Sequence, residues 1–334
     1  MSDRKNIGIL LLITLITVLT VEFLLHMLFP IRYADILDSY EYSDRLGYKF
    51  KKNLYNTEST DHYKEDITNS IGIVNIEEDY SDYNKIIYTI GDSYTKGSGS
   101  MYDASYPFFL SLFLNGGKEP NIYFKKDYGV LNLGVPGYGL KQSIIRLDEI
   151  RNKSVPPDII CYLGSENDYS DDALFLSGYK HKHLVDNNPF WNKWYMKPLK
   201  ILQRTQILSR LKLFISIFRQ RMIIEKSDSN KESIPNSQKM LLDLNRLIAA
   251  SKKNDSQLIL SWSDSESDSY NWLKTFSKEH NIMFADWHSI AKDYKMNFLP
   301  PKENNLHSGG HKRSWVNYII ALSFSHEIDS VGFK

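Results

Sequence analysis

Lys85-Ile-Ile-Tyr-Thr-Ile90, followed by Gly91-Asp-Ser-Tyr-Thr95, is the stretch of this sequence that decides the fold. Its first half is an apolar run of strand length, and its second half is a polar turn that begins with a glycine. A continuous apolar run is typical of a strand that is covered on both faces of a sheet. The stretch therefore predicts a buried strand that ends in a loop carrying polar side chains.

The same pattern recurs along the chain. Four further apolar runs of strand length occupy residues 129–133, 158–163, 257–262 and 282–286. Helical periodicity marks the intervals and the end of the chain, at residues 106–115, 140–151, 237–251, 267–279 and 311–328. Strands that alternate with helices predict a parallel sheet with helices on both faces. We therefore expect an α/β fold of flavodoxin-like type, with three layers (α/β/α) and about five parallel strands.

Polar loops follow the first three of these strands. They place Ser93 after the first, Gly137 after the second, and Asn167 with Asp168 after the third. Chemistry in such sheets collects at the carboxyl ends of the strands. We therefore expect these loops to meet at one edge of the sheet, together with His307 from near the C-terminus.

The four blocks, in this order, resemble those of the SGNH hydrolases (GDSL-like lipases and acylhydrolases) of the membrane-anchored bacterial type. The resemblance covers roughly residues 85–328. It implies that Ser93 is the nucleophile and His307 the base. It also implies an oxyanion hole formed by the backbone N–H groups of Ser93 and Gly137 with the side-chain amide of Asn167.

The residue types suit these roles. A serine hydroxyl is a weak nucleophile until a base takes its proton, and a histidine titrates near neutral pH. A glycine lets its N–H approach a substrate closely. Ser93 could instead be only a turn or helix-cap residue. His311 and His288 are the rivals of His307; we expect His311 to open the last helix, where the dipole disfavours an imidazolium.

The acidic member of a triad is the point at which this sequence departs from the family. The family usually has an aspartate three residues before the histidine, and here that position is Asn304. Asparagine can orient an imidazole but cannot neutralise its developing charge. Glu303 could substitute, or the enzyme could work as a Ser–His dyad. Asp92 and Asp168 are further supporting candidates.

The N-terminal segment is apolar from residue 7 to residue 29, which is long enough to span a bilayer as a helix. Arg4 and Lys5 precede it and acidic residues follow, so the positive-inside rule places residues 1–6 in the cytoplasm and the rest outside, periplasmic or extracellular. A cleaved signal peptide competes with this single-pass anchor. Glu22 and His26, one turn apart, could form an intramembrane site, lie near the outer interface, or pair the helix with a partner.

The remaining organisation follows from these assignments. We expect a stalk or N-terminal extension at residues 30–83 and a hydrolase domain at residues 84–330. An insertion at residues 178–236 contains an amphipathic segment with a basic face. Such a segment is either a surface helix or a lid or interfacial helix on an anionic membrane.

Composition restricts the partners and cofactors. A formal net charge of +1 argues against a nucleic-acid partner. One cysteine and the absence of CxxC or HExxH spacing give no support for a metal, and we expect no cofactor.

Three functions remain. The first is an esterase acting outside the cytoplasm on an O-acylated glycan or lipid. The second is an O-acetyltransferase working with envelope polysaccharide machinery. The third is a catalytically decayed binding or assembly protein. A flavodoxin-like nucleotide-binding protein ranks well below these, because no Walker-type motif is present.

Overall fold

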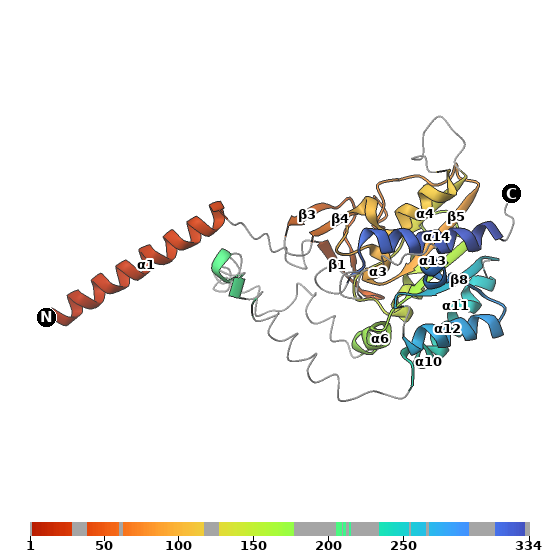
Figure 1. The fold of residues 1–334 in the computed structure, drawn as a ribbon. Coiled ribbons are helices and arrows are strands. Elements are labelled where there is room, and N and C mark those ends of the chain that lie inside the picture. The colour runs from red at the N-terminus through yellow and green to blue at the C-terminus, as the bar shows by residue number, and fades with distance from the viewer. Residues whose placement is uncertain are drawn as a thin grey trace. The chain divides into compact units, whose positions relative to one another are not determined.

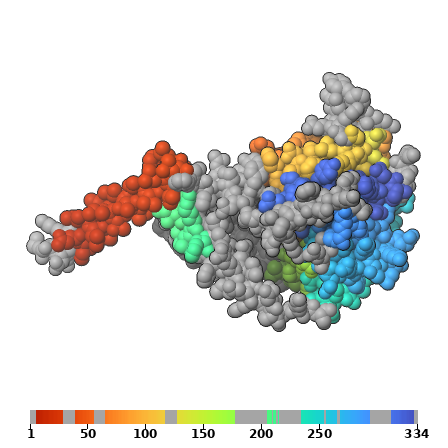
Figure 2. Space-filling model, in the orientation of Figure 1, coloured from red at the N-terminus to blue at the C-terminus, as the bar shows by residue number. Residues whose placement is uncertain are grey.

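The chain divides into two compact units, residues 1–34 with 186–232 and residues 35–185 with 233–334. The computed structural model (Figures 1 and 2) describes residues 2–28, 39–59, 63–116, 127–176, 205–208, 210–211, 214, 234–253, 255–264, 267–293 and 311–330.

The first unit begins with helix α1, Ser2–Leu28. Its segment Asn6–Leu28 has a mean hydropathy of 2.6, and in the described part of the chain it is the one helix long and apolar enough to cross a membrane. The hydroxyls of Thr14, Thr17 and Thr20 each donate to the carbonyl four residues back, so these polar groups are satisfied without water. The predicted apolar helix is confirmed, as a membrane anchor or a signal sequence.

Glu22 has partners in the insertion of this same unit. Its carboxylate accepts hydrogen bonds from the backbone N–H groups of Gln206, at 2.5 Å, and Ile207, at 3.0 Å. The side chain of His26, one turn away on α1, is exposed. Glu22 therefore pairs α1 with a segment of its own chain. Most of the amphipathic segment expected in the insertion lies outside the described residues.

The second unit is built on a five-stranded sheet of order β6-β5-β7-β8-β9. Every neighbouring pair of strands is parallel. The strands are β5 Lys85–Gly91, β6 Tyr128–Asn132, β7 Ile159–Gly164, β8 Gln257–Trp262 and β9 Met283–Phe284. The predicted sheet is confirmed, although its last strand has two residues instead of the five expected.

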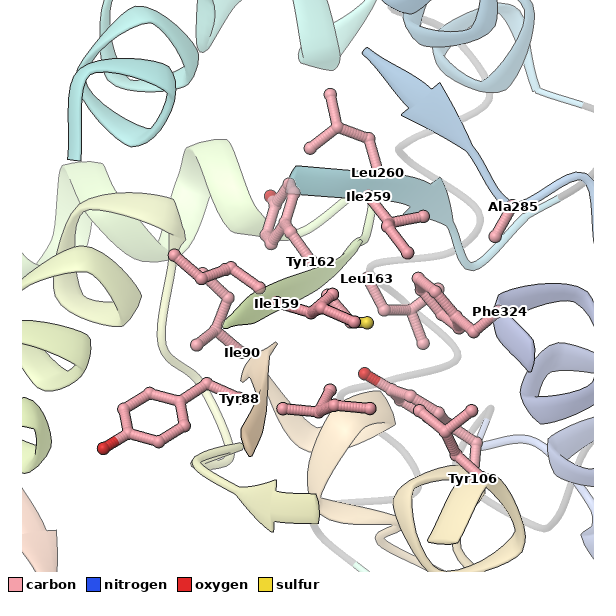
Figure 3. Close-up of a cluster of buried hydrophobic side chains, with 14 of the residues drawn as sticks. Tyr88, Ile90, Tyr106, Ile159, Tyr162, Leu163, Ile259, Leu260, Ala285 and Phe324 are labelled. Atoms are coloured by element: carbon pink, nitrogen blue, oxygen red, sulfur yellow. The ribbon is translucent and has the colours of Figure 1, made fainter. Parts of the chain in front are cut away.

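Burial explains why continuous apolar runs form the central strands. Every residue of β7 is buried, and in β5 only Lys85 is partly exposed. Figure 3 shows Tyr88 and Tyr106 on opposite sides of β5, so side chains fill the space on both faces of the sheet. The Tyr106 ring stacks on Phe324 with 5.5 Å between ring centroids.

Helices cover the sheet in two groups. α4 (Tyr106–Leu114) packs against α14 (Ser314–Ser330), and α5 (Leu140–Arg151) packs against α11 (Leu241–Lys253). The others are α3 Ser93–Lys96, η1 Tyr102–Ala104, α6 Asp168–Leu176, α10 Asn236–Lys239, α12 Asp268–Glu279 and α13 Trp287–Asp293. The last helix begins at Ser314, so His311 precedes it and does not open it.

The N-terminal extension contains two antiparallel hairpins. They pair β1 Tyr40–Ser43 with β2 Gly47–Phe50, and β3 Tyr55–Ser59 with β4 Tyr63–Ile67. The first hairpin contributes Tyr40, Leu46, Tyr48 and Phe50 to an apolar cluster that includes Val135 and Tyr138 from the loop after β6. The extension thus packs on one of the loops that are expected to form the site.

Candidate active site

Ser93 stands where β5 gives way to helix α3. The preceding Gly91 has φ +148°, and a Cβ there would lie 2.4 Å from Thr95 Oγ1, so only glycine fits. Asp92 caps α3, with its Oδ1 accepting from Tyr94 N–H at 2.8 Å. Because Ser93 is the first residue of the helix, no helical carbonyl can accept its N–H. Its side chain is partly exposed, which leaves it accessible to a substrate.

Two glycines bring the three loops into contact. A Cβ at Gly134 would lie 2.3 Å from Lys96 N, so the loop after β6 touches the helix that starts with Ser93. A Cβ at Gly139 would lie 2.4 Å from Asp168 O, so the same loop also touches the block after β7. The loops after β5, β6 and β7 therefore meet at one edge of the sheet.

Asn167 faces the nucleophile block. Its Nδ2 donates to Asp92 Oδ2 at 3.0 Å and to Asp171 Oδ2 at 2.8 Å. Both amide hydrogens thus point toward carboxylates, and an oxyanion would have to replace one of these acceptors. Gly137, with φ +72°, occupies the turn between β6 and α5.

A buried network lies behind Asn167. Ser165 Oγ is 2.9 Å from Asp92 Oδ2, 2.6 Å from Asp168 Oδ1 and 2.7 Å from Asn167 Oδ1. The Tyr162 hydroxyl donates to Asp168 Oδ2 at 2.5 Å. Since a serine hydroxyl has only one hydrogen, it cannot donate to all three neighbouring oxygens. A proton on Asp168 would let that carboxyl donate to Ser165, whose own hydrogen then goes to Asp92.

The electrostatics of the network favour that proton. Both carboxyl groups are fully buried. Burial raises the pKa of Asp92 to about 6, against the opposing effect of its hydrogen bonds. Burial, with the charge of Asp92 second, raises the pKa of Asp168 well above its usual range. Both effects favour the neutral, protonated form of Asp168.

The histidine block, which contains Glu303, Asn304 and His307, lies outside the described residues. The expected roles of these three residues therefore stay predictions. The chain returns to the site at His311, whose ring centroid is 5.7 Å from that of Tyr94, the neighbour of Ser93. Ser100 Oγ donates to Lys312 O at 3.4 Å. His288 instead contacts Tyr270 and Trp287.

The structure thus brings together Ser93, Asp92, Asn167 and Asp168, with the Gly137 loop beside them. The sequence did not point to Ser165 or Tyr162, although Ser165 stands in the polar loop after the third predicted strand, the loop that also contains Asn167 and Asp168. No group of three or more His, Cys, Asp or Glu side chains that could hold a metal occurs in the part of the chain that is described.

Comparisons with known proteins give distant structural likenesses. No family model matches the sequence, and no curated protein does. Among solved structures, the chain is similar to a protein assigned to the lipolytic G-D-S-L family from Desulfitobacterium hafniense (13% identity, TM-score 0.42, 73% of this chain and 99% of that one).

Two further structures are similar at the same level. A member of the lipolytic G-D-S-L family from Veillonella parvula is 12% identical, with a TM-score of 0.39 and coverage of 75% and 98%. The psychrotrophic esterase EstA from Pseudoalteromonas is 12% identical, with a TM-score of 0.40 and coverage of 74% and 98%. Such distant likeness carries no argument about function, which rests on the site itself.

Proposed function

We propose that this chain is a serine ester hydrolase of the SGNH type, with Ser93 as nucleophile. The observation that carries the proposal is the site geometry. Ser93 is partly exposed at the carboxyl end of β5, and the amide of Asn167 is tied to the adjacent Asp92 at 3.0 Å. The loop that carries Gly137 packs on helix α3, which begins with Ser93. A structural turn would not need these three groups at one edge of a sheet.

The reaction follows the acyl-enzyme route. Ser93 Oγ attacks the ester carbonyl carbon while His307 takes its proton, and the carbonyl oxygen becomes an oxyanion. The N–H groups of Ser93 and Gly137 and the amide of Asn167 stabilise that charge. Collapse of the intermediate releases the alcohol, which takes the proton from His307. Water, activated by the same histidine, then hydrolyses acyl-Ser93.

The third member of the triad is weakened in this chain. Asn304 in place of an aspartate can hold the imidazole but cannot balance its positive charge. We propose that His307 acts with Asn304, or with Glu303 as the acidic partner. Activity of Asn304→Asp above the wild-type level would favour the first arrangement, whereas loss of activity in Glu303→Gln would favour the second.

We further propose an O-acylated glycan or lipid outside the cytoplasm as the substrate. The apolar helix Asn6–Leu28, preceded by basic and followed by acidic residues, supports an anchor with residues beyond 30 outside. The same acyl-Ser93 could pass to a sugar hydroxyl, which would make the protein an O-acetyltransferase of the envelope polysaccharide machinery. Product analysis with and without a glycan acceptor separates hydrolysis from transfer.

The test of the mechanism uses the full chain in detergent. We expect turnover of p-nitrophenyl acetate that falls at least 100-fold in Ser93→Ala and in His307→Ala. His288→Ala is the control, because this histidine contacts Tyr270 and Trp287 and lies outside the four blocks that the SGNH pattern assigns to catalysis. Equal rates in all variants, with no labelling of Ser93 by a fluorophosphonate, would reject the esterase and favour a decayed binding protein.

A further inference from the structure

The first hairpin of the N-terminal extension holds the loop that carries Gly137. Tyr48 on β2 donates its hydroxyl to Pro136 O at 2.6 Å. The Tyr138 hydroxyl donates in return to Tyr48 O. The two rings meet edge to face with 5.2 Å between centroids, and both are buried. The hairpin thus binds the chain on both sides of Gly137.

The acceptor Pro136 O belongs to the same peptide unit as Gly137 N–H. A peptide group is planar, and in the trans form its C=O and N–H point in opposite directions. The described part of the chain contains no cis peptide bond. The hydrogen bond from Tyr48 therefore fixes the direction in which Gly137 N–H points. It also polarises the peptide, which strengthens that N–H as a donor.

Gly137 itself needs such support. Its φ of +72° lies in the left-handed region that glycine enters freely, so local backbone preference alone does not hold the turn. A further contact fixes the hairpin to the helix that follows: Gln142 Nε2 donates to Leu46 O at 2.9 Å. The turn is thus anchored by groups that come from nearly 90 residues earlier in the chain.

We infer that Tyr48 is a positioning residue for the oxyanion hole, acting through the Pro136–Gly137 peptide. The inference rests on the proposed function for its catalytic consequence, but not for the orientation of the peptide. It makes the hairpin formed by β1 and β2 a working part of the site, although none of its side chains needs to touch the substrate. Burial raises the pKa of the Tyr48 hydroxyl well above its usual range, so the hydroxyl stays a donor at every working pH.

The test compares two buried tyrosines of the full chain in detergent. Tyr48→Phe removes the hydroxyl and keeps the ring. Tyr88→Phe is the matched control, because Tyr88 is fully buried and donates to a backbone carbonyl, that of Val155, beyond α5. We expect Tyr48→Phe to lower kcat about 10-fold at all pH values, since loss of a whole oxyanion donor costs 100-fold or more. KM should change less than twofold, and Tyr88→Phe should match the wild type.

A second measurement needs no enzymatic activity. Pro136–Gly137 is the only Pro-Gly pair in the sequence. Labelling with ¹³C-carbonyl proline and ¹⁵N-glycine therefore gives a single correlation, which reports this peptide. We expect it to shift in Tyr48→Phe and not in Tyr88→Phe.

The two measurements separate the two proposals. An unshifted signal in Tyr48→Phe, or a kcat equal to that of Tyr88→Phe, would overturn the role of Tyr48. A wild type without Ser93-dependent turnover would overturn the esterase, while the signal would still decide whether Tyr48 orients the peptide.

Discussion

Buried carboxylates lie on two sides of the Ser93 helix, and the two sides accommodate them differently. Toward the extension, Asp66 forms an ion pair with Lys96 at 3.0 Å, and both side chains are at most 2% exposed. Lys96 also donates to Glu65 O at 2.5 Å. Toward Asn167, Asp92 and Asp168 share the hydroxyl of Ser165, and neither forms an ion pair with any described residue.

The difference shows which buried acid keeps its charge. Asp66 has a cation beside it, and Ser39 Oγ donates to its other oxygen at 2.6 Å, so the charged form is favoured. Asp168 has no such cation among the described residues, so burial first and the nearby carboxyl group of Asp92 second favour its neutral form. We therefore expect the first side to stabilise the fold evenly around neutral pH and the second to make stability depend on pH.

The largest expected effect comes from breaking the ion pair. Lys96→Met leaves Asp66 charged, buried and without its cation, which typically costs 3–5 kcal/mol. We expect a fall of about that size in the free energy of unfolding. Urea titration of the full chain in detergent, followed by tryptophan fluorescence, measures it.

Two controls give this result its meaning. Lys274 and Asp286 form a pair in which the Lys274 side chain is 50% exposed, so Lys274→Met should cost no more than about 1 kcal/mol. The double variant Lys96→Met/Asp66→Asn should recover part of the loss, because it also removes the negative charge that Lys96 balances. A loss in Lys96→Met no larger than that in Lys274→Met would show that the buried pair does not hold the extension in place.

The two buried carboxyl groups of Asp92 and Asp168 should make the stability of the protein depend on pH. Asp92 has a folded-state pKa of about 6, above its unfolded value of 3.8, and that of Asp168 is raised further. The folded state therefore binds more protons than the unfolded chain. The stability due to these protons is fully present below pH 3.8 and is lost as pH rises through the folded-state values.

Asp168→Asn tests this sign. Its amide nitrogen can donate to Ser165 and its oxygen can accept from Tyr162, as a protonated Asp168 would. We expect the variant to lose less stability than the wild type between pH 4 and pH 8, measured by urea titration at each pH. Parallel pH profiles for the two proteins would mean that Asp168 is already ionised across this range.

The sequence predicted one of these sides and not the other. Ser93, Asn167 and Asp168 follow continuous apolar strands, and parallel strands bring their carboxyl ends together, so their proximity followed from pattern alone. The extension has strands of four or five residues that mix tyrosines with charged residues. Such strands give no clear alternation, and local pattern does not encode the pairing of Asp66 with Lys96.

The link between Asp92 and Asp168 through the Ser165 hydroxyl could not be predicted from the sequence, for a different reason. Asp92 and Asp168 could be named as supporting candidates from their motifs, but only the fold places Ser165 between them. Likewise, Tyr48 reads as one more aromatic residue until Pro136 is seen to accept its hydroxyl. Long-range hydrogen bonds of single side chains leave no periodic trace in a sequence.

Glu22 extends the comparison to the other unit and predicts the smallest effect. Among the described residues, the partners of its carboxylate are the backbone N–H groups of Gln206 and Ile207. Loss of such a capping acceptor costs about 1 kcal/mol, so Glu22→Ala should speed tryptic cleavage after Arg210 roughly fivefold. His26→Ala is the matched control, because His26 is exposed on the same helix. Equal cleavage rates in both variants would mean that the insertion is held to α1 by packing and not by this carboxylate.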